Sequence, residues 1–442
     1  MKNGAKLLLG EKIKYIRSAK GISQENMARA INSNQSFVYR FENGQVECST
    51  KMLTKIKKFL EIENAPLLEH ELETYRDRIW IWNDLITAGR DAEAKVMQHE
   101  LSPILDLPFE NDLFLLFSLA EVRLLTRELK ITEAEKRLNE LEALLVDAND
   151  EVRYFYHRNK GSMHIQRGDF MNALRHYLQM LDTASDEVKP DAAVFANIGV
   201  SYMGIGKPYH AIENLLHARQ KCSDDRVHIV RASTNSMLAM AYAVIGEYKK
   251  AQKLFDESLL QAKNANDEAV IGLTLSNMSV LYYKMGNYEK SVELCDQALE
   301  YFQGKSPHLK TSAITIGGDK TLHKMLLLNK GSGLIKMKDD TKCQEVLEHG
   351  LALSEGDEKY TIGFTALRHF MTLDDSNSVS YLENVAIPYF RAGGGFDKYV
   401  TLDICGELES YYKKKRARTR ASVFVEIARD IYKEMFIGEI EL

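Results

Sequence analysis

The sequence predicts an all-α protein, and three observations lead to this fold class. Only 7 prolines and 26 glycines occur in 442 residues, a composition that favours helices over loop-rich β architecture. Beyond about residue 72, apolar residues recur almost everywhere with the period of a helix. A pattern of one glycine, one aromatic and one small residue also recurs about every 40 residues, which is typical of stacked helix pairs. The length indicates several domains or a repeat array.

The charge is unevenly distributed along the chain. The net charge is −5, but residues 1–60 contain 12 lysines and arginines against 4 acidic residues. This first segment therefore carries +8 and the remaining residues carry −13. A small basic head on an acidic body indicates that only the head meets a polyanion such as DNA.

Several classes of protein are excluded by composition. No stretch reaches the roughly 18 apolar residues that span a bilayer, and no secretory signal is seen, so we expect a cytoplasmic protein with no membrane partner. The histidine pairs, His157 with His164 and His210 with His217, lack a completing acid or thiol. No catalytic constellation stands out, so we expect no enzyme, no metal and no cofactor. Neither a disulfide framework nor a zinc site is indicated, because the cysteines are far apart: Cys48, Cys222, Cys295, Cys343 and Cys405.

The head begins with a pattern of short, capped helices. Apolar residues at i, i+4 and i+7 predict a first helix that ends at Gly21, built on Leu9, Ile13 and Ile16. Ser23 and Asn34 are typical N-caps and predict helices over about 24–31 and 35–42. Two more short helices are expected after residue 49. Two short helices joined by a tight turn form the helix-turn-helix plan.

The body repeats one helix-pair pattern. Four turn glycines lie 38, 40 and 40 residues apart, each followed by an aromatic and then a small residue. The glycine ends the first helix, the aromatic fills the gap between helices, and the small residue allows close approach. The three sets are Gly168, Gly206, Gly246 and Gly286; Phe170, Tyr209, Tyr248 and Tyr288; Ala173, Ala211, Ala251 and Ser291.

Weaker copies of the pattern extend the array in both directions, to about eight helix pairs. They are Gly89 to Ala94, Leu129 to Ala134, Asn329 to Cys343, and degenerate units over 360–395 and 400–440. A glycine- and proline-containing insertion over about 302–321 is expected to be a loop.

These motifs resemble known families. The strings Gly21-Ile-Ser-Gln-Glu-Asn-Met-Ala28 and Tyr39-Arg-Phe-Glu-Asn-Gly44 resemble the lambda-repressor-like, XRE-type domain, and the body resembles tetratricopeptide repeats. Together they resemble the RRNPP-type peptide-pheromone receptors (the Rap/Rgg/NprR/PlcR/PrgX group). The resemblance implies a five-helix DNA-binding domain over 1–62, a linker over 63–74, and a right-handed tetratricopeptide superhelix over 75–442 for peptide binding and dimerisation.

One face of the predicted third helix is left free for DNA. Gln35, Ser36, Tyr39 and Arg40 are not needed for the core, and Gln and Arg can pair bidentately with adenine and guanine. The resemblance implies base contacts at Gln35, Ser36 and Arg40, and supporting or phosphate contacts at Gln24 and Asn43. Tyr39 could stack on a sugar or touch a thymine methyl. The resemblance also implies an internal ion pair between Arg17 and Glu42. Generic phosphate contacts are expected from Lys12, Lys14, Lys20, Lys51 and Lys55.

Four repeats share an asparagine that could line a ligand groove. Each lies two residues before a small residue at the helix crossing, and its amide offers both a donor and an acceptor to a peptide backbone. These residues are Asn159, Asn197, Asn277 and Asn329. The alternative is that asparagine is simply frequent at this position in such repeats. Gln166 and Lys284 are neighbouring groove positions that could tune the choice of side chain.

The function that the resemblance implies is a quorum-sensing transcription regulator. Its partners would be double-stranded DNA with a pseudo-palindromic operator, a short signalling peptide, and a second copy in a homodimer. The alternative is a tetratricopeptide protein that acts on a response regulator or another protein, as a phosphatase or a sequestering adaptor.

Overall fold

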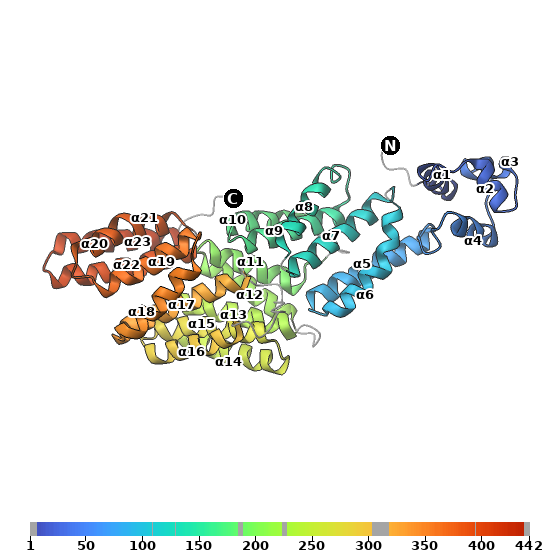
Figure 1. Ribbon diagram of the computed structural model, residues 1–442. Helices are drawn as coiled ribbons and strands as arrows, with labels where there is room; N and C mark the ends of the chain where they lie inside the picture. Colours follow the sequence, from blue (N-terminus) through green and yellow to red (C-terminus); the bar gives the residue numbers. More distant parts are fainter. Residues whose placement is uncertain are drawn as a thin grey trace. The chain divides into compact units, whose positions relative to one another are not determined.

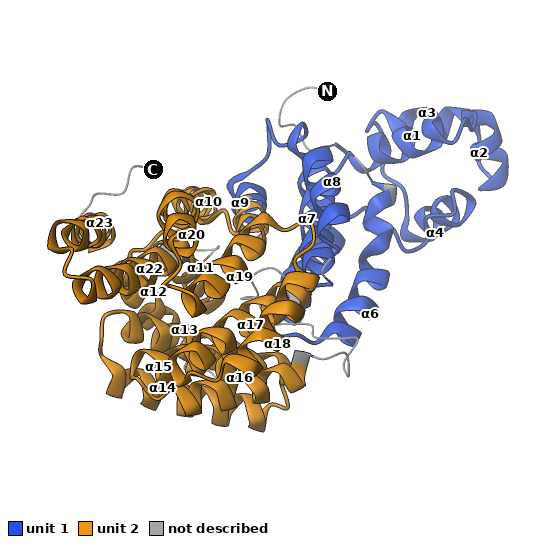
Figure 2. Cartoon of the chain, turned by 60° about the vertical axis from the view of Figure 1, so that its left-hand side comes forward, with its two compact units in different colours: residues 1–156 blue, residues 157–442 orange. Residues whose placement is uncertain are grey.

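The computed structural model describes residues 7–107, 109–128, 130–183, 189–222, 228–302, 318–393 and 395–436. Over these residues the chain is built from helices and contains no strand (Figure 1). The all-α prediction is therefore confirmed. The chain divides into two compact units, Met1–Tyr156 and His157–Leu442 (Figure 2).

Unit 1 begins with the head, whose helices are α1 (Leu9–Ala19), α2 (Gln24–Ala30), α3 (Gln35–Glu42) and α4 (Thr50–Phe59). The predicted caps are present: the Ser23 hydroxyl accepts the Asn26 N–H at 3.1 Å and the Asn34 side chain accepts the Phe37 N–H at 2.8 Å. The described head has one helix, α4, where the sequence suggested two short ones. No glycine or proline interrupts residues 50–59, so the helix runs through.

The rest of unit 1 is made of longer helices: α5 (Glu69–Thr87), α6 (Asp91–Leu101), a 3₁₀ turn (Ser102–Asp106), α7 (Asn111–Arg127), α8 (Ile131–Glu142) and the start of α9 (Asp150–Gln166). Trp82 of α5 is fully buried, with its ring 5.1 Å from that of Phe117. α5 begins within the predicted linker, since Glu71 accepts the N–H groups of Leu67 and Leu68 at 2.8 and 3.0 Å. The division into units falls elsewhere, so the boundaries 1–62, 63–74 and 75–442 stay a prediction.

Unit 2 continues the helix pairs. Its helices are α10 (Phe170–Asp182), α11 (Ala192–Gly204), α12 (Pro208–Lys221), α13 (His228–Val244), α14 (Tyr248–Asn264), α15 (Glu268–Lys284), α16 (Tyr288–Phe302), α17 (Gly318–Met337), α18 (Asp340–Leu353), α19 (Glu358–Met371), α20 (Ser376–Tyr381), α21 (Ile387–Ala392), α22 (Gly395–Lys414) and α23 (Arg418–Phe436). A π-helical turn, Leu382–Ala386, joins α20 to α21. From α5 onward the described residues form nine successive pairs, where the sequence indicated about eight. Most of the insertion predicted as a loop, 303–317, lies outside the described residues, but residues 318–321 are the start of α17, so the prediction of a loop is wrong there.

The repeat pattern has the physical basis that the sequence suggested. All four turn glycines have positive φ, from +74° to +83°, a conformation that glycine adopts without strain. The four small residues at the helix crossings are buried. Phe170 fills an inter-helix gap, because its ring packs against Gly204 so closely that a Cβ on Gly204 would lie only 2.0 Å from the ring. The gap-filling prediction is wrong for Tyr209, which is 58% exposed.

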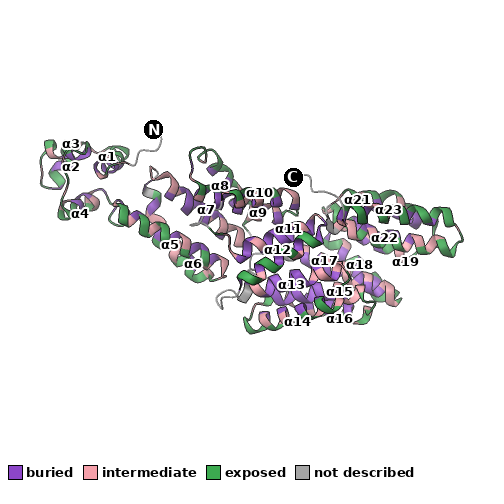
Figure 3. Cartoon of the chain, turned by 180° about the vertical axis from the view of Figure 1, so that it is seen from behind, coloured by how far each residue is buried: buried purple, intermediate pink, exposed green. Residues whose placement is uncertain are grey.

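The helices at the centre of unit 2 are buried on most sides. α11, α13 and α15 are largely purple in Figure 3, whereas α12, α14 and α16 keep exposed faces. Such a difference is expected when the first helix of each pair packs between its neighbours. No helix in the described part of the chain is long and apolar enough to cross a membrane.

The last helix pair closes one turn of unit 2. α22 packs against α11 and α23 packs against α12, although about 200 residues separate them in the sequence (Figure 2). The Lys207 ammonium donates to the backbone carbonyl of Glu434 at 2.8 Å, and the rings of Tyr209 and Phe436 lie 5.9 Å apart. α22 also reaches two inner helices of earlier pairs, since Lys284 of α15 lies over the Tyr399 ring and Lys336 of α17 pairs with Glu407.

Candidate DNA and ligand sites

A buried ion pair fixes α3 in the head. Arg17 Nε donates to Glu42 Oε1 at 2.6 Å, and Arg17 Nη2 donates to Glu42 Oε2 at 3.0 Å. The Glu42 side chain is fully buried, and Gln24 adds a third donor to it at 2.7 Å. Arg17 also donates to the Ile22 carbonyl at 2.5 Å. The pair ties α1 and the α2 entry to α3, so the internal ion pair that the resemblance implied is present.

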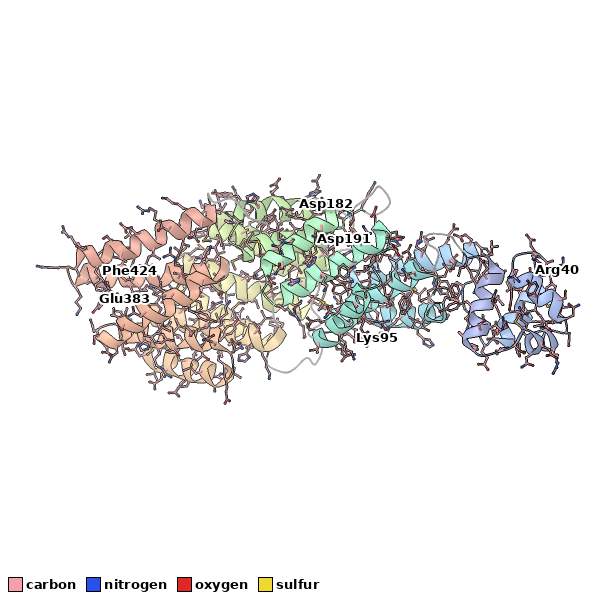
Figure 4. All side chains as sticks on the ribbon, turned by 90° about the horizontal axis from the view of Figure 1, so that it is seen from above. Arg40, Lys95, Asp182, Asp191, Glu383 and Phe424 are labelled. Carbon is pink, nitrogen blue, oxygen red and sulfur yellow. The ribbon has the colours of Figure 1, made fainter. Side chains whose placement is uncertain are left out.

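The outer face of α3 carries the predicted base-reading residues. The side chains of Gln35, Ser36, Tyr39 and Arg40 are all exposed, and none of them makes a hydrogen bond or ion pair with another described residue. Arg40 lies at the outer surface of the head (Figure 4). These side chains present amide, hydroxyl and guanidinium groups on adjacent positions of one short helix, which is the chemistry that reads base edges in a major groove.

Two further predicted DNA residues already have partners in the protein. Gln24 is half-buried and its amide N–H points to Glu42 at 2.7 Å. The Asn43 amide N–H bonds the Tyr39 carbonyl at 2.8 Å, at the end of α3. Their amide oxygens, which accept, cannot bind a phosphate oxygen. Contacts from Gln24 and Asn43 to a phosphate would therefore use the second N–H of each amide.

One generic phosphate contact predicted from the sequence is wrong. Lys12 is buried, where it donates to the Leu67 carbonyl at 3.1 Å and pairs with Glu110 at 2.6 Å. Its ammonium therefore holds the head to later residues of unit 1. Charge alone could not reveal this, because the partners lie far along the sequence. Lys14 and Lys51 are exposed as expected.

The asparagine row lies largely between helix pairs. Asn159, Asn197 and Asn277 are buried, at 4%, 5% and 7% exposure, while Asn329 and Gln166 are half-buried. Asn197 donates to the Tyr177 hydroxyl at 2.8 Å and Asn277 donates to the Ser236 hydroxyl at 3.1 Å. The amides of Asn197 and Asn277 thus bond to the preceding helix pair. This packing role agrees with the alternative that asparagine is simply frequent at this position in such repeats. The ligand role of the row stays a prediction.

Among the predicted groove residues, Lys284 contacts a stretch of α22 that the sequence did not single out. Its ammonium lies 5.7 Å from the centre of the Tyr399 ring on α22. On α17, Lys336 forms an ion pair with Glu407, also on α22. Asp403 lies between Tyr399 and Glu407 on the same helix. The only signal in the sequence was the i, i+4, i+8 spacing of these three residues, which does not tell what they face.

Other reactive groups are accounted for by burial. Among the described residues no group of three or more His, Cys, Asp or Glu is arranged to hold a metal ion. His157 and His176 approach to 3.1 Å between their Nδ1 atoms, and burial lowers the pKa of His176 to about 4. All five cysteines are free thiols. Burial raises the pKa to about 11 in four of them, Cys222, Cys295, Cys343 and Cys405.

Both the head and the repeat array match the models of known families. A helix-turn-helix family model matches residues 13–63, and a tetratricopeptide repeat model matches residues 230–304. The transcriptional activator NprA of Geobacillus stearothermophilus is 22% identical over 410 residues, which cover 90% of this chain and 97% of NprA.

Solved structures share the fold over most of the chain. A Rap protein complexed with competence and sporulation factor has a TM-score of 0.68 at 17% identity, covering 82% of this chain and 99% of the Rap chain. NprR in complex with its cognate peptide NprX has a TM-score of 0.64 at 16% identity, covering 81% and 99%. The apo form of NprR from B. thuringiensis gives 0.61 at 16% identity, again covering 81% and 99%. The motifs, the two family matches and these folds confirm the resemblance: the chain has the domain architecture and the fold of the RRNPP-type receptors.

Proposed function

We propose that this protein is a cytoplasmic transcription regulator that binds operator DNA through α3. The observation that carries the proposal is the free outer face of α3, with Gln35, Ser36, Tyr39 and Arg40, on a helix fixed by the buried Arg17–Glu42 pair. The helix-turn-helix match and the likeness to an activator support it. A homodimer would present two such helices about 34 Å apart to a pseudo-palindromic operator.

A short signalling peptide is the proposed ligand, bound on the concave side of unit 2. The support is the likeness to NprR, solved in complex with its cognate peptide NprX, and to a Rap protein solved with competence and sporulation factor. The residues proposed to contact it are those of the predicted groove: Asn159, Gln166, Asn197, Asn277, Lys284 and Asn329. Since Asn197 and Asn277 already bond within the protein, the exposed parts of Gln166, Lys284 and Asn329 are the first to test.

Capture of host genomic fragments tests the DNA-binding role. The purified full-length protein is compared with Gln35→Ala/Arg40→Ala and with the control Arg29→Ala, which removes an exposed guanidinium of α2 that pairs with Glu25. We expect enrichment of one or a few palindromic sites by the wild type and the control, with loss of roughly 1–3 kcal/mol of discrimination per removed contact in the double variant. Equal operator selectivity in all three proteins would refute the assignment of α3.

A second candidate function is action on a protein partner. Aspartyl phosphate phosphatase F of Bacillus subtilis shares the fold, with a TM-score of 0.52 at 16% identity over 83% of this chain. The full-length Gln35→Ala/Arg40→Ala variant separates the two functions, because its body is intact. Capture or dephosphorylation of phosphorylated host response regulators by this variant would establish the second function. No effect on any of them would exclude it.

A further inference from the structure

A row of side chains on α22 faces the inner helices of unit 2. Tyr399, Asp403 and Glu407 are four residues apart, so they share one stripe of the helix. The two ends of this stripe meet basic residues of other repeats: Lys284 of α15 lies over the Tyr399 ring, and Lys336 of α17 pairs with Glu407. α22 therefore stands opposite the helix surface on which the repeat pattern places the ligand.

Asp403 differs from its neighbours on the stripe. Its side chain is exposed, and it makes no hydrogen bond or ion pair with another described residue. The surrounding helices nevertheless raise the pKa of its carboxyl by burial, and the attraction of Lys284 and Lys336 does not offset this effect. An exposed carboxylate whose charged form is disfavoured by the surrounding helices is stabilised by a cation placed directly against it.

The neighbouring charges are already engaged. Glu407 is neutralised by Lys336, and the Lys284 ammonium lies against an aromatic face 5.7 Å from its centre. The Tyr399 hydroxyl is buried and has no hydrogen-bond partner in the described part of the chain, so a polar ligand could satisfy it too. Asp403 is thus the acidic group of this stripe that remains available to a ligand.

From this arrangement we propose that α22 forms the far wall of the ligand site and that Asp403 is a specificity-determining residue, whose carboxylate binds a cationic group of the peptide. The inference rests on the proposed peptide ligand. The cationic group is an ammonium or guanidinium, which a peptide can supply from a lysine or arginine side chain or from its amino terminus.

Four pools of random-sequence heptapeptides test the inference. The pools contain or lack lysine and arginine, and have a free or an acetylated amino terminus. The full-length protein captures each pool at equilibrium, and mass spectrometry measures the enrichment. We expect the wild type to enrich cation-bearing peptides, and Asp403→Asn to lose at least about tenfold of this preference. The pools also show which source supplies the cation.

Two further variants keep the result interpretable. Glu409→Gln lies on the same helix, where Glu409 pairs with Lys413 at 2.5 Å, and should retain the wild-type preference. Asp403→Lys places a third ammonium near Lys284 and Lys336 and should shift capture toward acidic peptides. Capture that ignores peptide charge, or an unchanged preference in Asp403→Asn, would overturn the role of Asp403 while leaving the peptide ligand in place. Capture of no pool by the wild type would overturn both proposals.

Discussion

Removal of Arg17 should unfold the head selectively. Arg17→Ala leaves the Glu42 carboxylate fully buried with only the Gln24 amide as its remaining side-chain donor. Breaking a buried pair in this way costs about 3–5 kcal/mol, because the charge left behind is uncompensated. A head of about 55 residues has a total stability of roughly 3–8 kcal/mol. The loss is therefore comparable with the whole stability of the head, and DNA binding should fail.

Hydrogen exchange measured by mass spectrometry is the direct assay. Amides of α1–α4 should lose protection in Arg17→Ala, whereas amides of unit 2 serve as an internal reference and should keep theirs. Arg29→Ala is the matched control, since it breaks the exposed pair with Glu25 and should cost less than about 1 kcal/mol. Arg17→Met/Glu42→Leu removes both charges and should regain most of the loss. A cost below about 1 kcal/mol for Arg17→Ala would show that the Arg17–Glu42 pair does not hold the head together.

Three other outcomes are expected. Gly204→Ala should destabilise unit 2 by about 1–3 kcal/mol in chemical denaturation, because the new Cβ would lie 2.0 Å from the Phe170 ring, whereas Gly406→Ala meets no atom within 4 Å and should not destabilise. Lys51→Ala should weaken DNA binding uniformly across sequences and reduce the salt slope by about one, and a change in sequence preference would contradict this. At pH 8 a thiol reagent should label half-buried Cys48 first. The four buried thiols keep pKa values of about 11, above the ordinary thiol pKa of 9.0, so the thiols of the unfolded chain ionise first and stability should fall as the pH rises from 9 toward 11. Fast labelling of Cys222, Cys295, Cys343 or Cys405 in the native protein would contradict the expected order of labelling. A melting temperature that does not change between pH 9 and pH 11 would contradict the expected loss of stability.

Most of the fold could be predicted from local sequence patterns. Ser23 and Asn34 cap the helices they were expected to cap, and the repeat glycines adopt the left-handed conformation that their spacing implied. A cap or a turn depends on residues within a few positions, so a single sequence reveals it. The exposed face of α3 could be predicted in the same way. The apolar residues of this short helix pack into the core, so the opposite face is exposed.

Contacts between distant residues could not be predicted in this way. Lys12 has the positive charge expected of a phosphate ligand, but its ammonium is buried in unit 1 against Glu110 and the Leu67 carbonyl. The Asn197 amide could bind a peptide backbone, but in this structure it donates a hydrogen bond to the Tyr177 hydroxyl. The packing of α22 against α11 depends on the summed rotation of all intervening repeats, which no local pattern encodes.

Coupling between peptide binding and operator binding is the decisive property of a peptide-controlled regulator. The measurement is the affinity of the full-length protein for its captured operator, with and without a saturating peptide taken from the enriched pool. We expect the peptide to change the operator affinity, and by linkage the operator must change the peptide affinity by the same factor. Affinities for each ligand that are unaffected by the other would contradict a peptide-controlled regulator, even if both ligands bind.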